Sequence, residues 1–138
     1  MELVLVIHSH LRWLVAIGII GALLASLFAV ARRQWLTFER WTVRVIPWML
    51  TLQLLLGLIL LVGSGATLGW DMPALRPQVE HATTMIVAVG ISHMLPRMLR
   101  NADVRRSANR AALAILGIGV LVFIGVVRLR GLVYWMPF

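Results

Sequence analysis

Long apolar runs, separated by three shorter polar or basic segments, make up most of the chain. Four of them, at residues 3–31, 45–62, 78–98 and 111–127, approach or exceed the roughly 20 helical residues that cross a hydrocarbon core of about 30 Å. The first run lacks a basic leader and is too long for the apolar region of a cleaved signal peptide, so we expect it to be retained. The pattern predicts a single transmembrane domain, residues 1–138, with four spans.

Each span must be helical, because lipid contains no water to satisfy backbone polar groups. Short connections make successive helices antiparallel neighbours, so the predicted fold is all-α, an integral membrane up-down four-helix bundle. We expect Pro47 to begin the second helix and Pro96 to close the third. The glycine- and proline-containing segment Gly63–Pro77 is expected to form an ordered turn on the outer face, placed to cover a site beneath it.

The composition agrees with a membrane protein, since 61% of the residues are hydrophobic and only 13% are charged. Cysteine is absent. Disulfides, iron–sulfur ligation and thiolate chemistry are therefore excluded. Any redox role must use histidine, methionine or a bound cofactor.

The formal net charge of +8 comes from arginine, which accounts for all 13 basic residues. Nine arginines fall in or beside two of the three loops: Arg32, Arg33, Arg40, Arg44, Arg97, Arg100, Arg105, Arg106 and Arg110. This positive-inside pattern predicts a multi-pass protein of the bacterial inner membrane, with both termini on the outer, periplasmic face. Anionic lipids are sufficient partners for the charge, and no nucleic acid is expected.

Aromatic residues lie mostly near the predicted interfaces, where we expect them to act as anchors. They are Trp13, Trp35, Trp41, Trp48, Trp70, Tyr134 and Trp135.

Ionisable side chains inside spans are expensive and are candidates for function. The first and third spans both begin at the outer face. With starts at Leu3 and Gln78, the helical rise places His8 about 7 Å and His81 about 5 Å below that face. Two histidines at one depth on two helices are the axial ligand pair that a b-type haem needs.

Helical geometry distinguishes the neighbouring candidates. Two residues turn a helix by about 200°, so only one of His8 and His10 faces the interior, and Arg12, one turn below His8, favours His8. The Arg12 side chain leans back toward the outer surface and is expected to reach Glu80 or a haem propionate. His93 lies about 18 Å along the helix from His81, so we expect one haem per chain.

Other readings of this group stay open. His8, His81, Arg12 and Glu80 could form a hydrogen-bonded cluster that joins two helices and binds no cofactor. Bacteriochlorophyll or a metal ion could replace haem, although a closed zinc site needs four ligands.

The remaining polar candidates have simpler readings. His10 and His93 are more often interfacial polar residues than ligands. Gln53 is more often an interhelical hydrogen bond than a quinone contact.

Three stretches carry a family resemblance: "HSHLRW" at the start of the first span, "GLILLVGSG" at the end of the second and "VEHATTMIVAVGISH" in the third. In these stretches the chain resembles small four-helix bacterial membrane proteins described as cytochrome-b-like. The resemblance implies haem b ligation by His8 and His81.

The leading hypothesis is a haem-b-binding electron-transfer protein or subunit that passes electrons between quinol and an outer-face acceptor. His8 and His81 would be the axial ligands of the haem iron, Arg12 and Glu80 would adjust the charge near the propionates, and His10 and His93 are weaker candidates. Quinone is a second candidate cofactor, and other membrane redox subunits are expected partners.

The alternative is a non-catalytic accessory subunit of a larger respiratory or photosynthetic complex, in which the His/Arg/Glu cluster is purely structural. Both readings favour an electron carrier or a complex subunit over a stand-alone enzyme. Proton transport is a weaker reading, because the midplane offers little besides Gln53.

Overall fold

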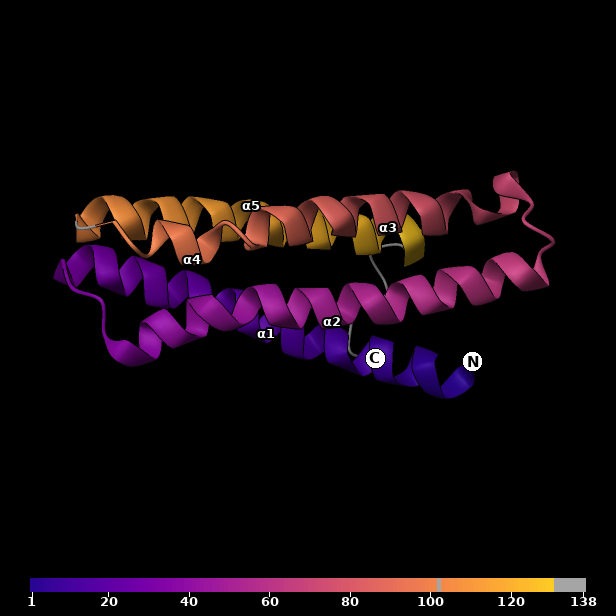
Figure 1. The fold of residues 1–138 in the computed structure, drawn as a ribbon, viewed down its shortest axis with the longest axis horizontal. Coiled ribbons are helices and arrows are strands. Elements are labelled where there is room, and N and C mark those ends of the chain that lie inside the picture. Colours follow the sequence, from indigo (N-terminus) through magenta and orange to yellow (C-terminus); the bar gives the residue numbers. More distant parts are fainter. Residues whose placement is uncertain (102, 131–138) are drawn as a thin grey trace.

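The computed structural model describes residues 1–101 and 103–130 and is all-helical over those ranges. The helices are α1 (Glu2–Arg32), α2 (Thr37–Thr67), α3 (Met72–Ser92), the short α4 (Leu95–Met98) and α5 (Val104–Arg130). In Figure 1 α1, α2, α3 and α5 lie along the long axis of the molecule, and each runs in the direction opposite to the long helix before it. The all-α, four-helix prediction is confirmed. The predicted position of the C-terminus and the anchoring of Tyr134 and Trp135 lie outside the described residues.

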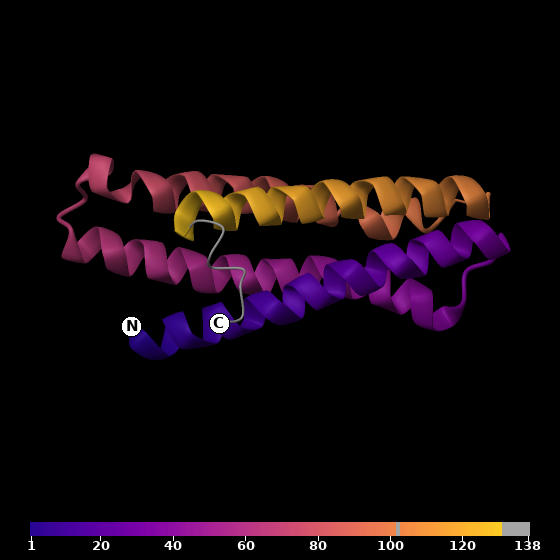
Figure 2. The ribbon, with the colours of Figure 1, turned by 180° about the vertical axis from the view of Figure 1, so that it is seen from behind.

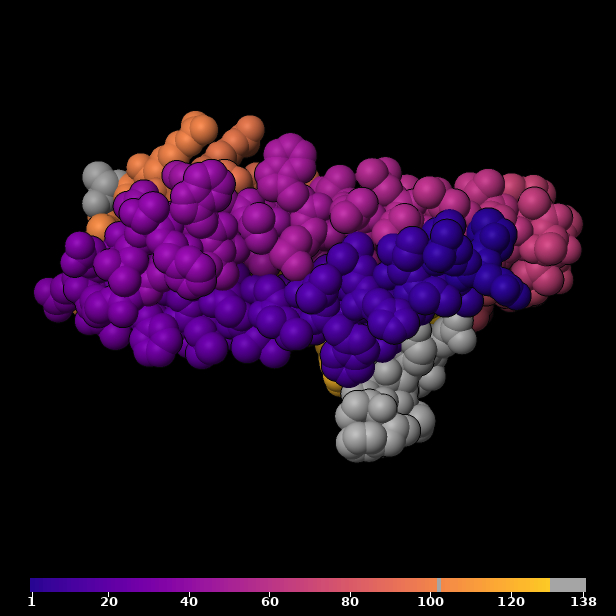
Figure 3. Space-filling model, turned by 90° about the horizontal axis from the view of Figure 1, so that it is seen from below, coloured from indigo at the N-terminus to yellow at the C-terminus, as the bar shows by residue number. Residues whose placement is uncertain are grey.

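The long helices form a ring in which α1 contacts α2 and α5, and α3 contacts α2 and α5. Figure 3 shows the first turns of α1 lying over the far end of α2. Among the described helices, α1, α2 and α5 are long and apolar enough to cross a membrane. The first half of α3 carries Arg76, Gln78, Glu80 and His81, and this polarity is why α3 falls short of the apolarity expected of a fourth span.

Helix α2 is longer at both ends than its apolar run. It begins at Thr37 rather than at Val45, so Pro47 lies inside the helix and not in its first turn. Figure 1 shows the first turns of α2 set at an angle to the rest, as a proline that lacks an N–H is expected to cause. At the other end α2 continues to Thr67, so the predicted loop 63–77 is reduced to the short connection Leu68–Asp71.

The predicted third span, residues 78–98, is displaced and interrupted. Helix α3 starts earlier, at Met72, and ends at Ser92, and the residues around Pro96 form the separate turn α4. Proline cannot donate to the carbonyl four residues before it, which for Pro96 is that of Ser92. The helix therefore breaks before Pro96 instead of closing after it.

Both arginine-rich connections lie at the same end of the bundle (Figures 1 and 2). Glu39 is buried and holds the connection between α1 and α2 in place. It pairs with Arg32 and accepts a hydrogen bond from the Leu36 N–H at 2.9 Å. Trp35 is buried as well and donates from its indole Nε1 to the Ser107 hydroxyl of α5 at 3.1 Å. Trp35 is therefore an internal contact and not the interface anchor that its position predicts.

The packed core occupies the half of the bundle nearer these connections. Its largest fully buried side chains include Ile46, Leu95, Leu99, Ile115 and Ile118. In the other half, residues 2–11 of α1 and 54–64 of α2 contain no buried side chain. Close packing thus holds the helices together at one end and leaves space between them at the other.

Trp35→Phe tests the buried contact between the α1–α2 connection and α5. The change removes the indole N–H and leaves the buried Ser107 hydroxyl without its donor, so we expect a loss of about 1–3 kcal/mol in the free energy of unfolding. Denaturant titration in detergent micelles measures it. Trp41→Phe, at an exposed tryptophan, is the control and should change stability by less than about 0.5 kcal/mol. Equal effects would contradict a structural role for Trp35.

Candidate functional site

A cavity of about 690 Å³ lies between α1, α2, α3 and α5, in the half of the bundle away from the arginine-rich connections. Ligand pockets in proteins commonly measure about 300–1,000 Å³. The cavity reaches the edge of the core at Leu50 and Val89. Most of its lining is apolar, and the polar residues in the lining are Glu2, His8, Ser9, Arg12, Gln53, Ser64, Thr67, Gln78 and His81.

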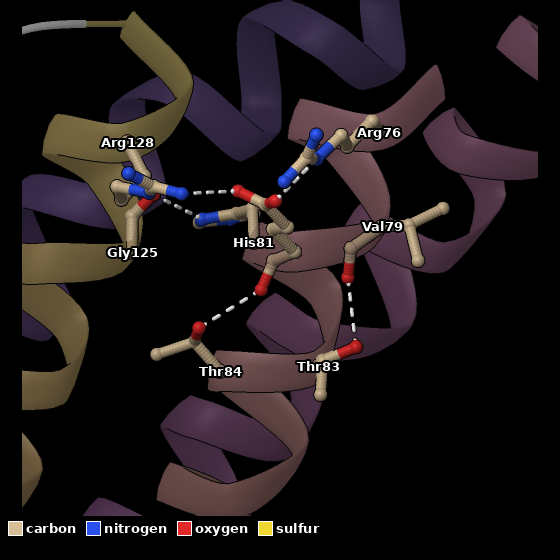
Figure 4. A network of polar contacts seen from close by, with 8 residues as sticks. Arg76, Val79, His81, Thr83, Thr84, Gly125 and Arg128 are labelled. Carbon is tan, nitrogen blue, oxygen red and sulfur yellow. Dashed lines mark hydrogen bonds and ion pairs between the residues drawn. The ribbon is translucent and has the colours of Figure 1, made fainter. Parts of the chain in front are cut away.

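His81 projects from α3 and forms a hydrogen bond to α5. Its Nδ1 lies 2.9 Å from the carbonyl oxygen of Gly125 (Figure 4). A carbonyl only accepts, so we assign the proton to Nδ1, which leaves the Nε2 lone pair of neutral His81 available. Metal-binding histidines usually carry such a bond on the nitrogen that does not ligate. His81 is thus held in the tautomer that a ligand role requires.

The close approach of His81 to α5 depends on glycine at position 125. A Cβ atom there would lie 3.3 Å from His81 Nδ1 and 2.7 Å from the Met85 methyl group. The missing side chain therefore lets the imidazole reach the backbone of α5.

His8 lines the same cavity from α1, on the opposite side of the ring of helices. Its ring packs against Gly57 of α2, where a Cβ would lie 3.2 Å from His8 Cε1. Gln53, also on α2, donates from Nε2 to the His8 backbone carbonyl at 2.9 Å. This bond confirms the predicted interhelical role of Gln53, and it holds the α1 backbone at the level of the cavity.

Two polar atoms beside the cavity, His8 Nδ1 and Gln53 Oε1, are buried without a hydrogen-bond partner among the described residues. Native proteins pair nearly all buried polar atoms, so such exceptions require an explanation. Both atoms belong to residues that line the cavity, and a polar ligand inside it has room to supply the missing partner.

Arg12 is buried and lines the cavity below His8, with its guanidinium carbon 4.9 Å from the centre of the Trp13 ring. Glu80 does not pair with it. One carboxylate oxygen of Glu80 accepts from Arg76 and the other from Arg128, each at 2.8 Å (Figure 4). These ion pairs take the place of the predicted contact between Arg12 and Glu80, and Glu80 is not part of the cavity lining.

The two other histidines lie away from the cavity. His10 is exposed, and its Nδ1 lies 2.8 Å from the Val6 carbonyl of its own helix. His93 is the C-cap of α3, and its Nε2 lies 3.0 Å from the Thr51 hydroxyl of α2. The structure thus brings together His8, His81 and Arg12 and leaves His10, His93 and Glu80 outside.

Gly57 and Gly125 are the site residues that the sequence does not reveal. Each is a glycine in an apolar helix, and its role depends on which ring faces it from another helix. The sequence could have indicated these glycines only through their depth, as glycines predicted at the same membrane depth as a histidine of another helix.

A bundle of apolar helices around a histidine-lined cavity is the class of structure that the fold and the site define. Within residues 1–101 and 103–130, no three His, Cys, Asp or Glu side chains gather into a metal-binding group. Comparisons with protein-family models, curated proteins and solved structures found no match. The described lining of the cavity contains two imidazoles, those of His8 and His81.

Gly125→Ala tests whether close approach to α5 positions His81. Gly117 of the same helix is the matched control, because a Cβ there meets nothing within 4 Å. Gly117→Ala should raise the free energy of unfolding by up to about 1 kcal/mol through helix propensity. Gly125→Ala should instead lower the free energy of unfolding by about 1 kcal/mol or more, because the added methyl group crowds His81 and Met85. Both variants are measured by denaturant titration in detergent micelles. Equal gains in both variants would contradict the close contact.

Proposed function

We propose that the chain is a multi-pass protein of the bacterial inner membrane that binds one haem b between His8 and His81 and transfers electrons between quinol and an acceptor at the outer face. The observation that carries the proposal is the pairing of the two imidazoles across one cavity, with the His81 proton held on Nδ1 by Gly125. A planar macrocycle between helices takes one axial nitrogen from each side.

The residues present fit such a group. Gly57 and Gly125 make room for the two histidine rings, which a Cβ atom would crowd. The apolar lining, which includes Val15, Leu50 and Met85, suits the face and edges of a porphyrin. His8 Nδ1 lacks a hydrogen-bond partner in the described chain, an unmet polar requirement that ligation through this nitrogen would resolve.

When bound, a haem b supplies reversible one-electron transfer at its iron. The chain's own residues set the conditions for that chemistry. The Gly125 carbonyl accepts a hydrogen bond from the Nδ1–H of His81, which orients the ring and raises the basicity of Nε2. The buried positive charge of Arg12 beside the cavity favours a carboxylate nearby, as on a haem propionate.

The arrangement of charge supports the orientation. Both arginine-rich connections lie at one end of the bundle (Figures 1 and 2), which the positive-inside rule assigns to the cytoplasm. The cavity and the N-terminus then face the periplasm, where an outer acceptor would dock.

The second candidate is an accessory subunit of a larger respiratory or photosynthetic complex, in which the polar cluster only joins helices. One observation favours it: the bond from His81 to Gly125 and the ion pair of Glu80 with Arg128 link α3 to α5 without any cofactor. The two candidates differ in whether the isolated chain carries pigment.

Purified wild-type protein should show a b-type reduced-minus-oxidised spectrum with about one haem per chain by pyridine haemochrome assay. His81→Ala and His8→Ala should each abolish that spectrum, because each removes an axial nitrogen. His10→Ala changes a neighbouring histidine outside the cavity and should retain it. A normal spectrum in His81→Ala would overturn the ligand assignment, and a colourless wild-type protein would favour the accessory subunit.

A further inference from the structure

His93, Thr51 and Trp48 form a second polar cluster, on the outside of the bundle where α2 meets the end of α3. The Nε2 atom of His93 lies 3.0 Å from the Thr51 hydroxyl, and the Trp48 ring meets the imidazole edge-on with centroids 6.4 Å apart. His93 is exposed, and Trp48 is 71% exposed. The helix break before Pro96 places His93 at the C-cap of α3, beside α2.

The surroundings of the cluster are apolar. Leu52, Leu55 and Met94 are each at least half exposed nearby along the two helices. Thr51 lies seven residues from Arg44, or about 10 Å along α2. Trp48 and His93 lie four residues, or about 6 Å, from Arg44 and Arg97. In the membrane orientation proposed above, the cluster therefore faces lipid just inside the arginine-rich interface. An ionisable group inside a membrane normally faces the protein interior and marks a functional site. A ligand that arrives through the lipid would cover this outward-facing histidine.

The hydrogen bond to Thr51 makes His93 adaptable. A hydroxyl both donates and accepts, so Nε2 of His93 can take either role toward Thr51. The Nδ1 atom then takes the opposite role toward a ligand, as an acceptor when Nε2 carries the proton and as a donor when it does not. The pair therefore suits a ligand whose polar group is a hydroxyl in one state and a carbonyl in another.

Trp48 indicates that the ligand is planar. Its exposed indole offers a face on which a planar ring can stack in an offset or edge-on manner. A planar ring that is apolar enough to travel in lipid and carries a group alternating between hydroxyl and carbonyl is a hydroquinone and its quinone. We propose that His93, Thr51 and Trp48 bind the headgroup of a membrane quinone or hydroquinone.

The location connects this site to the cavity. Leu50 and Val89, which line the inner end of the cavity, lie within one helical turn of Thr51 and His93 along the same helices. The membrane setting of the quinone site rests on the proposed function. The site extends that function, because it gives the quinol a place to bind next to the haem cavity but on the lipid side of α2 and α3.

The test is a binding titration of the full chain in lipid nanodiscs with a short-chain benzoquinone and its hydroquinone, followed by quenching of tryptophan fluorescence. Wild-type protein should give saturable quenching, and Trp48→Phe should remove most of it. Thr51→Val keeps the shape of the side chain but removes the hydroxyl, and it should weaken binding about tenfold, as expected for one lost hydrogen bond. His93→Leu should weaken binding at least as much.

His10→Leu is the matched control, since it removes another exposed histidine, whose Nδ1 bonds to the Val6 carbonyl of its own helix. Its binding curve should match that of the wild type. Equal affinity in wild type, Thr51→Val and His93→Leu would overturn the proposal. The titration needs no haem. If the purified protein is colourless but binds quinone at this site, only the haem proposal is contradicted. If it binds haem but shows no saturable quenching, only the quinone proposal is contradicted.

Discussion

The hydrogen bond from His81 Nδ1 to the Gly125 carbonyl is the contact on which the candidate site depends. This bond fixes the orientation of the His81 ring at the edge of the cavity. Because Nδ1 carries the proton, the bond also leaves the lone pair on Nε2. It also favours glycine at 125, because a Cβ there would lie 3.3 Å from His81 Nδ1 and 2.7 Å from the Met85 methyl group. One interhelical bond thus sets the position, the tautomer and the preference for glycine together.

The division of the bundle explains why such a bond can exist. Close packing of residues such as Ile46, Ile115 and Ile118 fastens the helices in the arginine-rich half. The other half, with the cavity, is held by polar contacts: Gln53 to the His8 backbone, His81 to Gly125, and Glu80 to Arg128. In an apolar setting these few hydrogen bonds and ion pairs keep the helices in register while leaving room for a ligand.

Local rules predicted much of this arrangement. Hydropathy and length predicted the helical fold and the position of α1 closely, and the period of the helix predicted that His8 and Arg12 face inward while His10 faces out. Hydropathy could not predict the ends of α2, because its first turns are helical but polar enough to fall outside the apolar run.

Features that depend on a second helix were beyond the reach of the sequence. The pairing of Gly57 with His8, of Gly125 with His81 and of Glu80 with Arg128 is set by how the helices are rotated and staggered against one another. The burial of Trp35 against Ser107 has the same origin, since position near an interface says nothing about which neighbour a ring meets.

Haem ligation by His8 and His81 can be measured by electron paramagnetic resonance spectroscopy of the oxidised, purified wild-type protein. Two imidazole ligands impose a strong field on ferric haem, so the account predicts a low-spin signal from one bis-histidine haem per chain. A high-spin signal would mean that at least one of His8 and His81 is not a ligand, and no haem signal at all would contradict the proposed site.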